Sequence, residues 1–237
     1  MKSICVGAFY QMLSFFRIRK AVFFSFFFPS FAYIIFSLTW GWRNEVYNIF
    51  LFSGMICLTI VSDSLFSTGN VIVEYYHNGL IKFFKCLPYP FFYHLLSLFM
   101  SRIIIIFLSM VVLVVVALLS GNISFNQFLF GNYILCMLIG LILFSLLGTI
   151  VAMITKDFTG NSTAQNIILF AMLFLSNTFY PISELNPLFT HVVQLNPITP
   201  IIQIARGESV VYLTLGIWLV VLSLISIIFF RKQQIKR

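Results

Sequence analysis

Charged side chains are scarce in this sequence. Asp, Glu, Lys and Arg make up 8% of the 237 residues, against about 25% in ordinary soluble domains. Hydrophobic residues make up 61%. A soluble protein of this size needs polar groups to cover its surface, and this chain does not supply them. Lipid must therefore contact most of the surface, which identifies an integral membrane protein.

The residues that carry chemistry are few and scattered. The sequence contains no Gly-x-x-x-x-Gly-Lys-Ser/Thr phosphate-binding loop, so it offers no ATP site of that kind. The three His and four Cys residues show no metal-ligand spacing. The six acidic residues do not cluster, as those of a membrane enzyme would. We expect no metal and no cofactor in this chain.

The formal charge of +8 could suggest a nucleic-acid partner. The basic residues, however, stand at the edges of long apolar runs, where membrane topology accounts for them. We therefore expect membrane lipid, and no nucleic acid, as the partner of these charges.

Six apolar runs are long enough to cross about 30 Å of hydrocarbon, which takes about 20 helical residues. They predict an all-α polytopic membrane protein with six transmembrane helices. The predicted spans are Ala21–Trp40, Val46–Phe66, Phe92–Leu119, Tyr133–Thr155, Thr163–Tyr180 and Val210–Phe230.

The basic residues also predict the orientation, because Lys and Arg gather in cytoplasmic loops. With the N-terminus inside, only Arg43 and Arg206 of the 14 Lys and Arg residues fall outside. Both termini are therefore predicted to be cytoplasmic. Asp63 and Arg102 are the only charges within the predicted spans, and both lie near the inner end.

Residues 1–20 precede the first span and are predicted to form an interfacial helix. Their polar members recur every three or four positions and so share one helical face: Ser3, Gly7, Gln11, Ser14 and Arg17. A narrow polar stripe on an otherwise apolar helix suits the plane of the membrane interface. The alternative is a plain cytoplasmic extension of the first span.

Segment 71–90 joins the second and third spans on the inner side. Gly79 interrupts it, and Pro88 and Pro90 stop any helix. Between these residues an apolar stripe has helical spacing, formed by Leu80, Phe83, Phe84 and Leu87. The pattern predicts a short amphipathic helix that either lies on the membrane or docks into a partner.

Segment 181–207 joins the fifth and sixth spans on the outer side and contains two Asn-Pro pairs, at Asn186–Pro187 and Asn196–Pro197. Asn caps free backbone amides and Pro fits the first helical position, so each pair predicts a helix start. The predicted helices are Pro187–Leu195 and Pro197–Ala205, with Gly207 ending the second.

These two helices are apolar but too short to cross the membrane. We therefore predict a re-entrant hairpin that dips into the outer leaflet, where protein neighbours must satisfy its broken backbone. The hypothesis is that it forms an outer gate, built on Pro181, Asn186, Pro187, Asn196, Pro197 and Arg206. The alternative is a purely structural plug.

In the fourth span, Gly140, Gly148 and Ala152 share one helical face. Small residues on one face allow another helix to approach closely, so this face is predicted to be a packing surface.

Several motifs along the chain have the order and spacing of one transporter family. Pro29 lies within the first span, and Glu74, Gly79, Leu80 and Pro88 follow the second. The late motifs are Phe179-Tyr180-Pro181, Leu195-Asn196-Pro197 and Arg206-Gly207. Together they resemble the permeases of type-2 ATP-binding-cassette (ABC) exporters. Two positions depart from that pattern: Tyr75 replaces the Arg that usually follows the acidic residue, and Lys82 replaces an acidic residue after the Gly.

The resemblance implies a single transmembrane permease domain over residues 1–237 that is not itself an enzyme. Two permeases, identical or different, would form a pathway for an amphiphilic drug, lipid, peptide or glycan in the inner or plasma membrane. Two separate ABC ATPase subunits would bind ATP and Mg²⁺ and dock at the coupling residues Glu74, Gly79, Leu80, Phe83, Phe84 and Pro88. A stand-alone secondary transporter or channel, or a non-transporting immunity or assembly protein, are the alternatives.

Overall fold

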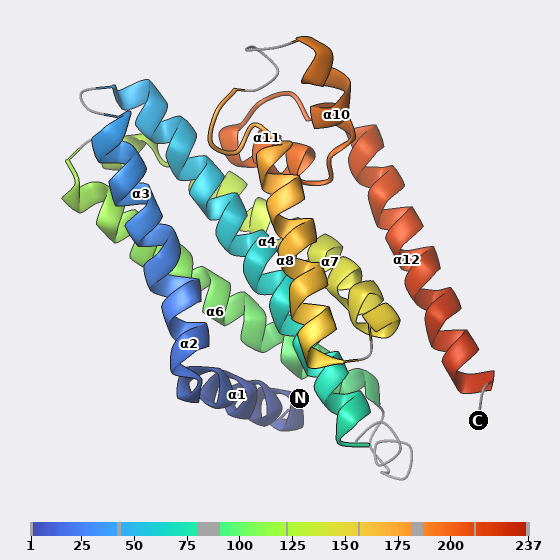
Figure 1. Ribbon diagram of the computed structural model, residues 1–237. Helices are drawn as coiled ribbons and strands as arrows, with labels where there is room; N and C mark the ends of the chain where they lie inside the picture. The colour runs from blue at the N-terminus through green and yellow to red at the C-terminus, as the bar shows by residue number, and fades with distance from the viewer. Residues whose placement is uncertain are drawn as a thin grey trace.

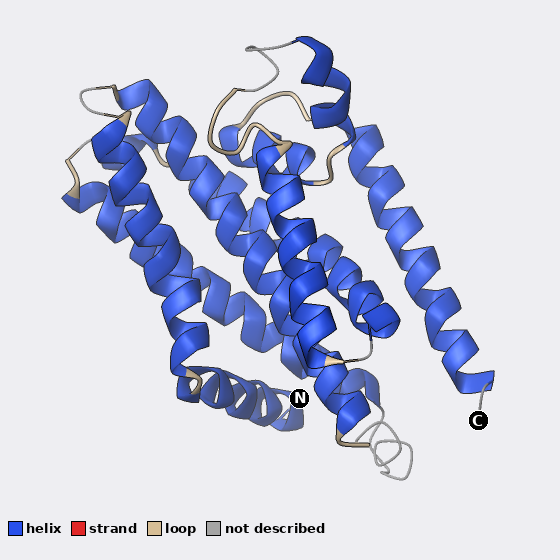
Figure 2. Cartoon of the chain, in the orientation of Figure 1, coloured by secondary structure: helices blue, strands red, loops and turns tan. Residues whose placement is uncertain are grey.

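A computed structural model describes residues 2–41, 44–79, 91–121, 123–155, 157–181, 187–210 and 212–235. Every regular element in these ranges is helical (Figure 2). The prediction of an all-α fold is confirmed for the part of the chain that the structure describes.

Helix α1, Lys2–Arg17, lies across one end of the bundle and packs against α6, Phe91–Leu119 (Figure 1). Two members of its predicted polar stripe, Gly7 and Gln11, face the protein, whereas Ser14 and Arg17 are exposed. A Cβ added at Gly7 would stand 3.0 Å from Ser97, and Gln11 Nε2 lies 3.4 Å from the Tyr75 hydroxyl. The exposed surface of α1 is largely apolar, including Val6, Phe9, Tyr10, Leu13 and Phe16. The predicted helix is therefore present, and Gly7 and Gln11 of its polar stripe take part in packing against the protein.

The first predicted span is one continuous helical segment with a change of winding. It consists of α2 (Arg19–Val22), the π-helix η1 (Phe23–Phe27) and α3 (Phe28–Thr39). Pro29 cannot donate a backbone hydrogen bond to the preceding turn. The Phe28 amide instead donates to the Phe23 carbonyl, five residues back, which is the bonding of a π-helix.

Helix α4, Glu45–His77, is the central element. Its most apolar window is 78% buried, whereas that of the last helix, α12 (Tyr212–Ile235), is 11% buried. Helix α4 continues well past the predicted end at Phe66. Its last turns occupy the start of the predicted coupling segment, so that part of the segment extends the second span.

Helix α7, Phe130–Thr155, makes the most extensive contact with α4. A Cβ added at Gly148 would stand 2.4 Å from the Leu65 carbonyl oxygen, and one at Gly140 would stand 2.7 Å from Ile60. The small-residue face predicted in this helix is confirmed as the surface on which α4 packs.

Helix α8, Phe158–Phe174, begins and ends earlier than the predicted span Thr163–Tyr180. Asp157 sets its start, because the carboxylate accepts a hydrogen bond of 2.6 Å from the Gly160 amide and caps the first turn. The chain beyond α8 forms turns over residues 175–178.

The remaining elements lie mainly at the end of the bundle opposite α1 (Figure 1). They are η2 (Phe125–Gln127), η3 (Pro187–Phe189), α10 (Thr190–Leu195) and α11 (Ile198–Arg206). The α10 and α11 helices match the two predicted between the fifth and sixth spans to within a few residues. Helix α11 packs against α4 and α7.

Among the residues that the structure describes, four helices are long and apolar enough to cross a membrane: Glu45–Tyr75, Leu96–Leu119, Phe130–Thr155 and Tyr212–Phe229. The apolar stretch Phe23–Thr39 and helix α8 have 17 residues each, shorter than these four. Both run beside the longer helices in Figure 1. The start of α1 and the last turns of α12 lie at the same end of the bundle.

Candidate functional site

The turn between α10 and α11 is fixed by two polar side chains. Asn196 Oδ1 accepts a hydrogen bond of 3.1 Å from the Ile198 amide, which has no acceptor within the first turn of α11. Thr199 Oγ1 donates back to the Val193 carbonyl. Asn196 and Pro197 thus stand at the start of α11. The helix begins at Ile198, one residue later than the predicted start at Pro197.

The same Asn196 side chain reaches the end of α8. Its Nδ2 donates to the carbonyls of Met172, at 2.7 Å, and Leu175, at 3.0 Å. Carbonyls in the last turn of a helix lack partners within that helix, so they need an outside donor. Asn196 is 8% exposed, and water has little access to replace it. The side-chain amide of Asn196 therefore caps the first turn of α11 and also satisfies carbonyl groups at the end of α8.

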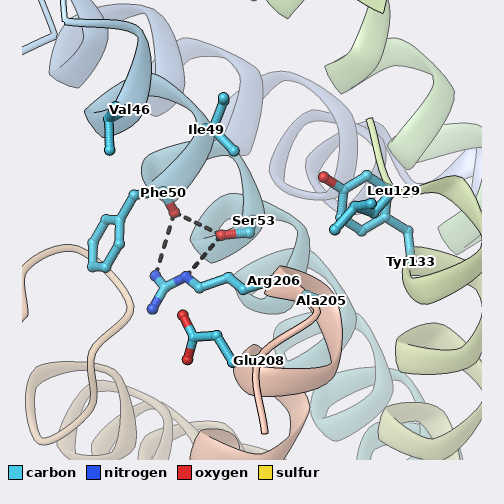
Figure 3. Close-up of a pocket in the computed structure, with 9 residues that line it drawn as sticks. All are labelled: Val46, Ile49, Phe50, Ser53, Leu129, Tyr133, Ala205, Arg206 and Glu208. Carbon is cyan, nitrogen blue, oxygen red and sulfur yellow. Dashed lines mark hydrogen bonds between the residues drawn. The ribbon is translucent and has the colours of Figure 1, made fainter. Parts of the chain in front are cut away.

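Arg206 fixes the other end of α11 (Figure 3). Its Nε donates to Ser53 Oγ at 3.0 Å, and one terminal nitrogen donates to the carbonyls of Phe50, at 3.3 Å, and Asn177, at 2.8 Å. The guanidinium lies 3.6 Å from the centre of the Phe50 ring, in a cation–π contact. Arg206 thus joins α11 to α4 and to the turns that follow α8.

Gly207 ends α11, as predicted. Its φ of +69° is in the left-handed region, and the Glu208 amide donates to the Gln203 carbonyl at 2.9 Å. A Cβ at this position would also stand 3.2 Å from Leu129. Glycine therefore satisfies both the backbone conformation and the close packing.

A cavity of about 190 Å³ opens beside Arg206, between α4, α7 and the end of α11 (Figure 3). Its wall combines apolar side chains with one cation and one acid. The lining residues are Val46, Ile49, Phe50 and Ser53 from α4, Leu129 and Tyr133 from the start of α7, and Ala205, Arg206 and Glu208.

Two predicted gate residues stand apart from this cluster. Pro181 is half-buried in the chain after α8, where neighbouring Phe179 stacks on Phe36 of α3 at 5.6 Å. Pro187 begins η3. Asn186 lies outside the described residues. Of the predicted set, Asn196 and Pro197 thus stand at the start of α11 and Arg206 at its end, each end with its own contacts.

The predicted coupling residues lie at the other end of α4. Glu74 is exposed on its last turns, and Gly79 follows its end with a φ of +65°. That conformation suits glycine and ends the helix. The predicted stripe of Leu80, Phe83 and Phe84, together with Pro88, lies outside the described residues.

A polar contact at this same end involves a residue that the sequence did not single out. Ser25 Oγ, in the π-helix, donates a hydrogen bond of 2.9 Å to Asp63 Oδ1. Arg102 is buried nearby on α6, with its guanidinium 5.2 Å from the centre of the Phe15 ring of α1. The sequence pointed to this contact only indirectly, because Asp63 and Arg102 are the charged residues within the predicted spans.

Within the described residues, no group of three His, Cys, Asp or Glu side chains could hold a metal ion. What this arrangement can do is mechanical: polar side chains connect helices that belong to different spans. Catalysis would need acidic or nucleophilic side chains close together. The cavity lining has one cation, Arg206, and one acid, Glu208.

The family model described as ABC-2 type transporter matches residues 3–208, from α1 through the end of α11. No curated protein matches the sequence significantly.

Proposed function

Because the chain belongs to the ABC-2 type transporter family, we propose that it is the permease subunit of an exporter that moves an amphiphilic substrate outward. Members of this family supply the membrane component of the transporter. A separate ABC ATPase would bind ATP and Mg²⁺ and provide the energy. Two permease subunits, identical or different, would enclose the pathway.

The proposed topology has six spans with both termini in the cytoplasm. The four long apolar helices support four of them. We assign the other two to the continuous segment Arg19–Thr39 and to helix α8, whose 17 residues extend about 26 Å. The basic residues of the loops support the orientation.

The observation that carries the proposal is the length and position of α4. Its 33 residues form one helix, about 50 Å long at 1.5 Å per residue. One end leads directly into the predicted coupling segment after Gly79. Near the other end, Phe50 and Ser53 hold Arg206. A displacement at the ATPase would therefore move the outer contacts through a single continuous helix.

In the proposed mechanism the α10–α11 segment forms a re-entrant hairpin and acts as the outer gate. Asn196 ties it to α8, and Arg206 ties it to α4. Movement of α4 relative to α8 would change both sets of contacts together and open the exit. This is alternating access, with the closed arrangement held by hydrogen bonds in a setting that excludes water.

The proposal is tested by asking whether the chain carries a functional ABC ATPase. The tagged chain is purified from its native membrane, placed in lipid nanodiscs and assayed for co-purified ATPase activity. Leu80→Asp with Phe83→Asp should release the ATPase or uncouple its hydrolysis, because charge on the apolar stripe would prevent docking. Phe125→Asp makes a matched change at an exposed position near the opposite end and should have no effect. Absence of an ATPase, or normal coupling in the double variant, would refute the proposal.

A further inference from the structure

The cavity beside Arg206 has charged groups whose role the proposed gate does not explain. Nε and one terminal nitrogen of Arg206 make its three hydrogen bonds, all to neutral acceptors. Its other terminal nitrogen has no hydrogen-bond partner among the described residues. A half-buried guanidinium favours a planar anionic partner such as phosphate or carboxylate, which it can bind through two N–H groups.

A negative charge lies on the same rim. Glu208 is exposed, follows Arg206 by two residues and interacts with its charge. Figure 3 shows the guanidinium with Phe50 on one side and the Glu208 carboxylate on the other. The rim therefore presents one cation and one anion side by side, a pattern complementary to a group that carries both phosphate and ammonium.

The size of the cavity limits what can enter. Its volume of about 190 Å³ is below the range of about 300–1,000 Å³ typical of sites that enclose a whole drug-sized ligand. It is enough for a compact polar headgroup. The rest of an amphiphile would have to stay outside.

The mouth is suited to an apolar tail. Val46 and Leu129 line the cavity and are 78% and 44% exposed, whereas Tyr133 and Ala205 are buried in its floor. Apolar side chains at the mouth would contact acyl chains, while the polar group reaches Arg206.

We propose that this cavity binds the headgroup of a zwitterionic phospholipid, with its phosphate on Arg206 and its ammonium on Glu208. The acyl chains lie along Val46 and Leu129. A bound lipid would give the second terminal nitrogen of Arg206 a phosphate oxygen as its hydrogen-bond acceptor and would occupy the space between α4 and α11. The outer-leaflet location rests on the proposed topology, but binding itself needs neither the ATPase nor transport.

Site-specific photocrosslinking tests this proposal. A photoreactive phenylalanine analogue replaces Leu129 at the cavity mouth, or Ile142 on the exposed face of α7 as a matched control. Each variant is placed in nanodiscs of equal phosphatidylethanolamine and phosphatidylglycerol, and mass spectrometry measures the ratio of the two lipid adducts. Both lipids carry phosphate, but only the first carries ammonium.

At position 129 the ethanolamine lipid should be enriched about two- to fivefold over the ratio at position 142, within the range expected for one partly exposed charge contact. Glu208→Gln should return the ratio at 129 to that at 142, because this exposed change removes the ammonium partner without touching the α11 contacts. Arg206→Gln should lower both adducts at 129. Soluble glycerophosphoethanolamine should not compete, since it lacks the chains.

Equal ratios at the two positions, or a ratio at 129 that Glu208→Gln leaves unchanged, would overturn the proposal. Competition by the soluble headgroup would overturn the assignment to a membrane lipid. None of these outcomes depends on co-purified ATPase activity, so failure here is distinguishable from failure of the proposed export function.

Discussion

Gly54 of α4 lies directly against the backbone of Thr178, in the turns that follow α8. A Cβ added at Gly54 would stand 2.1 Å from the Thr178 carbonyl oxygen. That neighbour is backbone and cannot rotate away, so only glycine allows this approach. The contact is close to the residues that hold Arg206, namely Ser53 and Asn177.

Gly54→Ala should therefore push α4 away from the turns after α8. The expected loss is about 1–3 kcal/mol, the usual cost of forcing one extra group into a packed site. Gly216→Ala, on α12, is the control, because an added Cβ there meets no atom within 4 Å. Thermal unfolding in detergent, followed by size-exclusion chromatography, measures both variants. Equal stabilities would show that the contact is not required.

Asn196→Ala should impair export more than it impairs assembly. The change removes the donor for the Met172 and Leu175 carbonyls, and each buried group left unsatisfied costs about 1–3 kcal/mol. If the hairpin is a gate, export per assembled complex falls or substrate leaks. Asn166→Ala is a matched control, since that exposed side chain bonds only within its own helix.

The plug alternative gives a different result for Asn196→Ala. Protein abundance and export would then fall together, and the export rate per assembled complex would be unchanged. Measuring both quantities in the same membranes separates a gate from a plug.

Asp63→Ala should destabilise the inner end of the bundle. Asp63 and Arg102 are 7% and 6% exposed, and their charges attract one another. Breaking a direct buried ion pair costs about 3–5 kcal/mol. The cost here should be smaller, because Asp63 Oδ2 and Arg102 Nε have no hydrogen-bond partner among the described residues and the two residues are not in direct contact as an ion pair. The double variant Asp63→Ala with Arg102→Met should recover much of this loss, because neither charge remains.

Ser25→Ala should have a smaller effect, since it removes a single hydrogen bond. Such a bond contributes about 0.5–1.5 kcal/mol to stability. Folded yield in the membrane fraction measures all three variants. If the double variant is no more abundant than Asp63→Ala, the two charges do not compensate one another.

The six-span topology predicts which sites face outward. With native cysteines replaced, a single Cys at Asn126, exposed in the loop that contains η2, should react with an impermeant thiol reagent added to intact cells. A Cys at Lys85 or Lys236 should react only after the membrane is opened. Labelling of position 236 in intact cells would show an odd number of spans.

Much of the fold follows from composition and local pattern. Apolar length located the helical segments, and small residues on α7 identified the face that packs on α4. Gly207 and the Asn-Pro pair at Asn196 bounded α11, because both act through the backbone next to them. Local rules succeed where the physical cause lies within a few residues.

The parts that were missed have different causes, and only the Arg206 contacts depend on distant backbone. Arg206 bonds to the carbonyls of Phe50 and Asn177, and every residue has a carbonyl, so no side chain in the sequence marks these acceptors. The extension of α4 beyond Phe66 was missed because apolar length locates the part of a helix that crosses the membrane and not its full extent. The earlier start of α8 depended on Asp157 as a cap, a single residue that the apolar run did not include.

The low burial of α12 bears on how the protein is handled. Because only 11% of its apolar window is buried within the chain, helix α12 takes most of its contacts from whatever surrounds the molecule. Extraction exchanges those contacts for detergent, while α4, with 78% of its apolar window buried, keeps most of its own. The choice of detergent therefore acts first on the last helix, and a purified sample can retain an intact central bundle while α12 has already separated from α7.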